Sequence, residues 1–178
     1  MLIKSVFAGF GGQGVLSMGL NLTQAAMIEG KHVTYLPAYG AEMRGGTANC
    51  TVAISDEEIA SPVASSPQLV VVMNQPSLVR FQNQVDSNGV VFINTSLIVA
   101  EVLRTDIDVI KVAANQIAEE LGSARSANMV MLGAFIKKSN LVLFDTIVDV
   151  VHSLLEGKGE KLFAANKKAL ETGYRLIN

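Results

Sequence analysis

The feature that most constrains this chain is a glycine-rich turn between a short apolar run and an amphipathic stretch. Residues 2–8 are mostly apolar, and Gly9, Gly11 and Gly14 then follow with the spacing G-x-G-x-x-G. Glycines let the backbone turn sharply and approach a ligand closely, and the amino end of the next helix carries partial positive charge. This order predicts a strand, a turn that can hold an anion, and a helix. The motif is equally consistent with a strand-to-helix turn that binds nothing.

The residues after the turn argue against a nicotinamide cofactor. Dinucleotide-binding folds place an acid at the end of the second strand, about 20 residues beyond the glycines, to hold the ribose. Here the second apolar run, 32–37, ends without a carboxylate, and Glu29 comes too early, just before Gly30. We expect Gly30 to end the first helix. We therefore expect no binding of NAD(H) or NADP(H).

Composition excludes several further classes of function. The chain has 178 residues, of which 49% are hydrophobic and 17% charged, with a net charge of −2. This predicts one domain over 1–178, with some of its surface facing another subunit, and it excludes nucleic-acid binding. No apolar run is long enough to span a membrane, and the first residues lack a secretory pattern, so we expect a cytoplasmic protein. One cysteine, Cys50, and two histidines predict neither an iron–sulfur cluster nor a zinc site.

Strand and helix patterns alternate along the rest of the chain. Short β-branched runs at 69–73, 90–93 and 109–112 predict buried parallel strands, with helices between and after them. Only about ten residues separate the second strand from the strand at 48–54, too few for a crossover helix. That third strand is expected to be antiparallel or to lie at the sheet edge. The predicted fold class is α/β: a Rossmann-like three-layer domain with a mostly parallel sheet and a helical C-terminus.

The loop before this third strand is the second segment whose residue types suit ligand binding. It contains Glu42 and Arg44, followed by Gly45 and Gly46. It begins at the carboxyl end of the second strand, where open α/β sheets bind ligands, and so close to the glycine turn. The guanidinium of Arg44 offers a planar fork suited to phosphate or carboxylate. The alternative is a surface ion pair between Glu42 and Arg44 in an ordinary turn.

Together the two segments resemble one known family. The glycine turn at 9–14, followed by the segment 39–50, is similar to the gamma subunit of the 2-oxoacid:ferredoxin oxidoreductases, which act on pyruvate, 2-oxoglutarate or ketoisovalerate. The resemblance extends to the segments 54–59, 61–62, 73–77 and 128–133 and covers the chain to about Gly157. The sequence of residues 41–44 is more similar to the 2-oxoglutarate and branched-chain members than to the pyruvate members.

The resemblance implies a subunit of a multisubunit enzyme. Such an assembly oxidatively decarboxylates a 2-oxoacid to its acyl-CoA and passes the electrons to a ferredoxin or another acceptor. Its thiamine diphosphate and Mg²⁺ belong to the alpha and beta subunits, and its iron–sulfur clusters to the beta or a ferredoxin-like delta subunit. This chain would then hold no metal and no catalytic residue, would support assembly and would engage coenzyme A. The implied binding residues are Gly9, Gly11, Gly12, Gln13, Gly14, Glu42, Arg44, Gly45 and Gly46.

A different class of function is compatible with the same residues. The chain could be a stand-alone α/β protein that binds a nucleotide or another phosphorylated small molecule through the glycine turn. If the chain is instead an oxidoreductase subunit, we expect the isolated chain to be inactive and to associate with itself, for example as a homodimer. The residues leave open whether the glycine turn contacts coenzyme A or a partner subunit, and which 2-oxoacid is used.

Overall fold

A computed structural model describes residues 1–39 and 47–177 of the chain. Strands and helices alternate through the first two thirds, and helices alone follow. The strands are β1 (Leu2–Phe10), β2 (His32–Tyr39), β3 (Thr47–Ser55), β4 (Leu69–Val72), β5 (Val90–Asn94) and β6 (Asp108–Val112). The helices are α1 (Val15–Ile28), α2 (Gln75–Phe81), α3 (Ala114–Glu120), α4 (Ala127–Ser139), α5 (Phe144–Leu155) and α6 (Glu160–Arg175), with short 3₁₀ turns η1 (Gln82–Gln84) and η2 (Ala124–Ser126).

The six strands form one sheet in the order β2-β3-β1-β4-β5-β6. Strands β1, β4, β5 and β6 are parallel, whereas β3 runs antiparallel to both β1 and β2. Of the two alternatives for the third strand, the antiparallel one is confirmed and the edge position is wrong, because β2 forms the edge. Backbone pairing shows the difference: β3 pairs along its length with β1 on one side and with β2 on the other.

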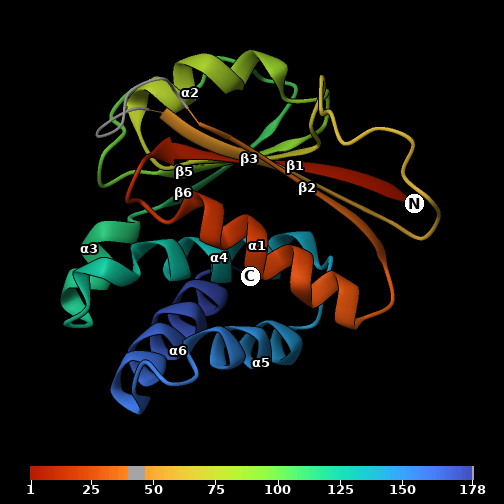
Figure 1. Ribbon diagram of the computed structural model, residues 1–178. Coiled ribbons are helices and arrows are strands. Elements are labelled where there is room, and N and C mark those ends of the chain that lie inside the picture. Colours follow the sequence, from red (N-terminus) through yellow and green to blue (C-terminus); the bar gives the residue numbers. More distant parts are fainter. Residues whose placement is uncertain (40–46, 178) are drawn as a thin grey trace.

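Helices cover both faces of the sheet, as the three-layer prediction requires, but they cover them unequally (Figure 1). On one face α1, α3 and α4 lie against the strands, and α5 and α6 lie beyond them. The core of this face includes the rings of Phe7 and Phe92, whose centroids lie 5.0 and 5.4 Å from that of Phe135 in α4. The opposite face carries a smaller core, in which Leu78 and Phe81 of α2 pack over the other side of β1, β4 and β5.

The helices of the thicker face depend on two glycines. A Cβ added at Gly173 of α6 would collide with the backbone carbonyl of Val130 in α4, and one added at Gly133 would collide with the carbonyl of Leu170. The two helix backbones therefore approach each other more closely than any side chain would allow. This crossing fixes α6 against α4 and so shapes the end of the molecule where α4 begins.

Cys50 belongs to the core, as the alternation of its strand predicts. Its side chain is fully buried, and its thiol donates a long hydrogen bond to the carbonyl of Val15, at 3.6 Å. Burial raises the pKa of the Cys50 thiol to about 12, so the group stays protonated near neutral pH and is a poor nucleophile.

Across residues 1–39 and 47–177 we find no helix that could cross a membrane and no acid, histidine and cysteine grouping suited to a metal ion.

Candidate functional site

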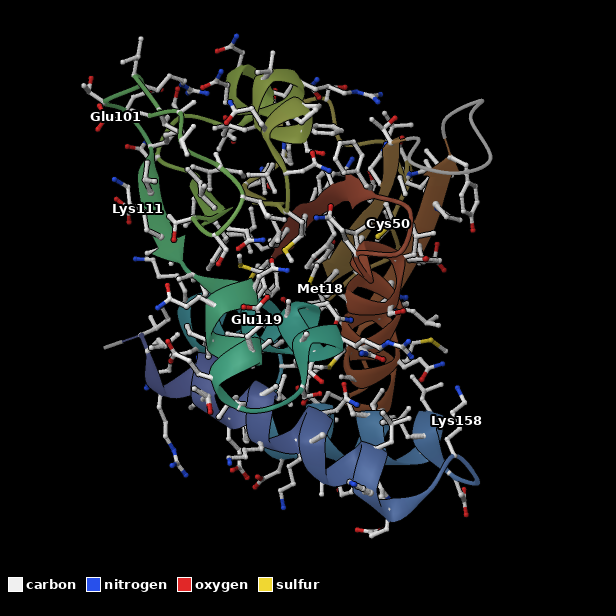
Figure 2. All side chains as sticks on the ribbon, turned by 90° about the vertical axis from the view of Figure 1, so that its left-hand side faces the viewer. Met18, Cys50, Glu101, Lys111, Glu119 and Lys158 are labelled. Atoms are coloured by element: carbon white, nitrogen blue, oxygen red, sulfur yellow. The ribbon has the colours of Figure 1, made fainter. Side chains whose placement is uncertain are left out.

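The topology gathers several loops at one end of the sheet. Since β3 is antiparallel to both β1 and β2, the strands β1, β2, β4, β5 and β6 all point the same way. Their carboxyl ends lie at the same end of the sheet, on the left of Figure 1 and toward the viewer in Figure 2. The glycine turn follows β1 at this end, and α3 follows β6 there. Open α/β sheets bind ligands at the carboxyl ends of their strands.

Three glycines of the turn, Gly9, Gly12 and Gly14, are explained by backbone angles or by close neighbours. Gly12 and Gly14 have φ angles of 93° and 72°, in the region that disfavours side chains. Gly12 has open space around it, whereas a Cβ at Gly14 would collide with the side-chain amide of Asn128. Gly9 is crowded in another way, because a Cβ there would lie 2.7 Å from the Oε1 atom of Gln13. The motif is thus explained by local backbone shape and by a close approach between α1 and α4.

The side chain of Gln13 holds the turn in place. Its Oε1 atom accepts hydrogen bonds from the backbone N–H of Phe10, at 2.7 Å, and from the Nδ2 of Asn74, at 3.0 Å. Its Nε2 atom donates to the carbonyl of Met73, at 3.3 Å. These bonds tie the glycine turn to the end of β4. Gln13, predicted as a ligand-binding residue, therefore has a positioning role whether or not a ligand is present.

A pocket of about 330 Å³ lies beside the turn. It occurs where α1 and α4 begin, and neither helix has a side-chain cap or an acidic residue in its first turn. Uncapped amino ends present backbone N–H groups and partial positive charge, which favours an anion. The one charged side chain among its lining residues is the cation Arg125. The lining residues are Gly12, Gln13, Met73, Asn115, Ala124, Arg125, Ala127 and Asn128.

Arg125 is the residue that reasoning from the sequence missed. Its side chain is exposed, and its guanidinium makes no ion pair or hydrogen bond with the described parts of the chain. It comes from η2, 111 residues after Gly14, so no local pattern connects it with the glycine turn. Asn128 gave a weak signal, because it opens the segment 128–133 that carries the family resemblance.

The second predicted segment lies only partly within the described structure. Glu42, Arg44, Gly45 and Gly46 fall outside the described residues, and their roles stay predictions. The strand ends that flank them are placed: Tyr39 pairs with Ala48, and Thr47 pairs with Phe10, at the start of the glycine turn. The sheet therefore puts Thr47 directly beside the turn and Tyr39 one strand further away.

The two positive-φ glycines allow a matched test of the turn. Gly12→Ala should cost about 1 kcal/mol of unfolding free energy, because only backbone strain is added. Gly14→Ala should cost about 1–3 kcal/mol more, because the new methyl group must also displace Asn128. Chemical denaturation of the two variants measures the difference. Equal losses would contradict the close approach between Gly14 and Asn128.

Comparison with known proteins shows the family to which this chain belongs. A family model described as pyruvate ferredoxin/flavodoxin oxidoreductase matches residues 4–176. A ketoisovalerate oxidoreductase subunit VorA from Methanothermobacter marburgensis is 42% identical over 96% of this chain. A 2-oxoglutarate synthase subunit KorC from the same organism is 32% identical, and the alignment covers 96% of this chain and 94% of the relative.

A solved structure gives the same fold. A 2-oxoglutarate:ferredoxin oxidoreductase from Magnetococcus marinus, with 2-oxoglutarate, coenzyme A and succinyl-CoA bound, superposes with a TM-score of 0.92 at 24% identity. The match covers 98% of this chain and 31% of that one, and this chain likewise spans 36% of the VorA subunit. The present chain thus corresponds to about a third of these longer polypeptides.

Proposed function

The chain belongs to the pyruvate ferredoxin/flavodoxin oxidoreductase family, and from that premise we propose that it is the gamma-type subunit of a 2-oxoacid:acceptor oxidoreductase. The reaction would be the oxidative decarboxylation of a 2-oxoacid to its acyl-CoA. A ketoisovalerate enzyme subunit and a 2-oxoglutarate synthase subunit are among its relatives, so a branched-chain 2-oxoacid or 2-oxoglutarate is the proposed substrate. This agrees with the similarity of residues 41–44 to those members.

Within this assembly the chain would bind and position rather than catalyse. Thiamine diphosphate, Mg²⁺ and iron–sulfur clusters would be held by alpha, beta and delta subunits, with ferredoxin as the acceptor. The described residues offer no grouping that could hold a metal ion, and the thiol of Cys50 is buried and protonated. We assign decarboxylation and electron transfer to the partners, as the family resemblance implies. A cytoplasmic location and self-association of the isolated chain stay predictions.

The observation that carries the proposed role is the pocket beside the glycine turn. It combines the amino ends of α1 and α4 with Arg125 and has no acidic residue among its lining residues. This is a site for a phosphate group, and coenzyme A carries such groups at one end of the molecule. We assign the pocket to a phosphate of coenzyme A, because the site's charge and its place at the sheet edge both suit that anion. Arg44 would add a second cation.

The test is reconstitution with the thiamine-dependent and cluster-bearing subunits from the organism that encodes this chain. The complex should co-purify and convert one 2-oxoacid of a panel to its acyl-CoA, with electrons delivered to ferredoxin. Omission of this chain should abolish assembly or the dependence of the rate on coenzyme A. An isolated chain that binds ADP or coenzyme A tightly but ignores these subunits would instead support the stand-alone phosphate-binding alternative.

A further inference from the structure

A second pocket, larger than the first, lies among the helices of the thicker face. Its volume is about 360 Å³, and it is enclosed by the amino half of α1, the start of α4, the end of α5 and the start of α6. Of the segments that carry the family resemblance, only 128–133 contributes to its lining. Its lining residues are Ser17, Leu20, Asn21, Arg125, Ser126, Asn128, Met129, Val151, Leu154, Leu155, Lys158, Leu162 and Asn166.

The wall of this pocket is mostly apolar, but it also contains the side-chain amide of Asn21. Leu154 and Leu155 of α5 and Met129 of α4 provide much of the apolar surface. Asn21 of α1 is only 4% exposed and contributes a side-chain amide to the wall. An amide can both donate and accept hydrogen bonds, so Asn21 offers a polar contact to a bound molecule.

The charged side chains of the pocket are both cations. Lys158 comes from the loop between α5 and α6, labelled at the lower right of Figure 2, and Arg125 comes from η2. The ion pairs among the described residues use other cations, so neither Lys158 nor Arg125 is neutralised there. Glu156 and Glu160 flank the loop, but they line a separate hollow beside Phe163. The charge at this pocket is therefore positive and uncompensated.

We propose that this pocket binds a small amphipathic anion, a carboxylate or phosphate head group on an apolar chain. The apolar walls would take the chain, and the head group would meet Lys158, Arg125 and the amide of Asn21. The volume lies at the lower end of the range for small-molecule sites. The site shares Arg125 and Asn128 with the glycine-turn pocket but is distinct from it, so this inference goes beyond the proposed role in binding coenzyme A.

Titration of the full chain with three probes of equal chain length tests the proposal. Octanoate and octyl phosphate should each bind with saturable heat in calorimetry, and their relative affinity identifies the preferred head group. Octyltrimethylammonium, which carries the opposite charge, should bind at least tenfold more weakly. Acetate and inorganic phosphate, which lack the chain, should bind at least tenfold more weakly than their octyl counterparts. Equal binding of the cationic probe, or no binding of either anionic probe at millimolar concentration, would overturn the proposal.

Two variants locate the bound probe. Lys158→Gln removes the charge but keeps an exposed polar side chain. It should weaken octanoate or octyl phosphate binding about tenfold, because a charge-assisted contact is lost. Asn21→Leu replaces the amide at nearly constant volume and should weaken the same binding about fivefold. Lys161→Gln, a nearby exposed cation outside the pocket lining, is the matched control and should change nothing. If Lys158→Gln and Asn21→Leu bind like the unmodified chain, the probe lies elsewhere and the proposal is wrong.

Neither Lys158 nor Asn21 lines the glycine-turn pocket, so failure of this proposal leaves the proposed function standing. Conversely, failure of reconstitution with partner subunits would not alter the binding of octanoate by the isolated chain. The two ideas can therefore be refuted separately.

Discussion

Replacing Gly173 with alanine is expected to lower the free energy of unfolding by about 3 kcal/mol. The new Cβ would collide with the carbonyl of Val130, and backbone cannot turn away as a side chain can. The helices α4 and α6 would have to separate, which opens the core around Phe135. An alanine in place of an exposed helical glycine would instead stabilise by about 1 kcal/mol. Urea denaturation followed by circular dichroism measures the effect.

Gly19→Ala is the matched control for this prediction. It makes the same change in the middle of α1, but the neighbouring atoms belong to the side chains of Cys50, Tyr35 and Val52. A Cβ at Gly19 would lie 2.4 Å from the Sγ atom of Cys50, so that side chain must move. Because a side chain can rotate whereas a backbone carbonyl cannot, we expect a smaller loss than at Gly173. Gly133→Ala, which would meet the carbonyl of Leu170, should behave like Gly173→Ala. If Gly173→Ala is as stable as the unmodified chain, α4 and α6 do not cross as described.

The second large effect is expected at Arg125, and it depends on the proposed function. In the reconstituted complex, Arg125→Gln should raise the apparent KM for coenzyme A at least tenfold. The reason is the loss of a charge-assisted contact to phosphate, which contributes on the order of 1.5–3 kcal/mol. Arg125→Lys should recover little, because a point charge does not reproduce a planar two-pronged donor. Initial rates at varied coenzyme A and saturating 2-oxoacid give the result.

The control for Arg125 is Arg175→Gln, an exposed cation at the end of α6 that lines neither pocket. It should leave the KM for coenzyme A unchanged. Co-purification of the subunits must be measured in parallel, since weaker assembly would lower the rate by another route. An Arg125→Gln complex that assembles normally and keeps its KM would show that the glycine-turn pocket does not hold a phosphate of coenzyme A.

Much of the fold follows from local patterns in the sequence. The β-branched runs at 69–73 and 90–93 became β4 and β5, and the short connection before residue 48 excluded a crossover helix, which left an antiparallel or an edge strand. Family membership also follows from the sequence, because the motifs at 9–14 and 39–50 lie in a chain that the family model matches almost throughout. Local patterns give such results because strand periodicity, turn chemistry and motif spacing depend on neighbours along the chain.

The sequence alone therefore determined the glycine turn, its place after the first strand, a third strand that is either antiparallel or at the edge, and the family. Only the tertiary structure decided that β2 forms the edge, that Gln13 holds the turn together, and that Arg125 and Asn128 lie beside Gly12 and Gly14. It alone also revealed the pocket around Asn21 and Lys158. The physical reason is sequence separation. The side chain of Gln13 bonds to residues 60 and 61 positions away, and Arg125 lies 111 positions after Gly14, so the geometry of these contacts is set by how the helices and strands pack.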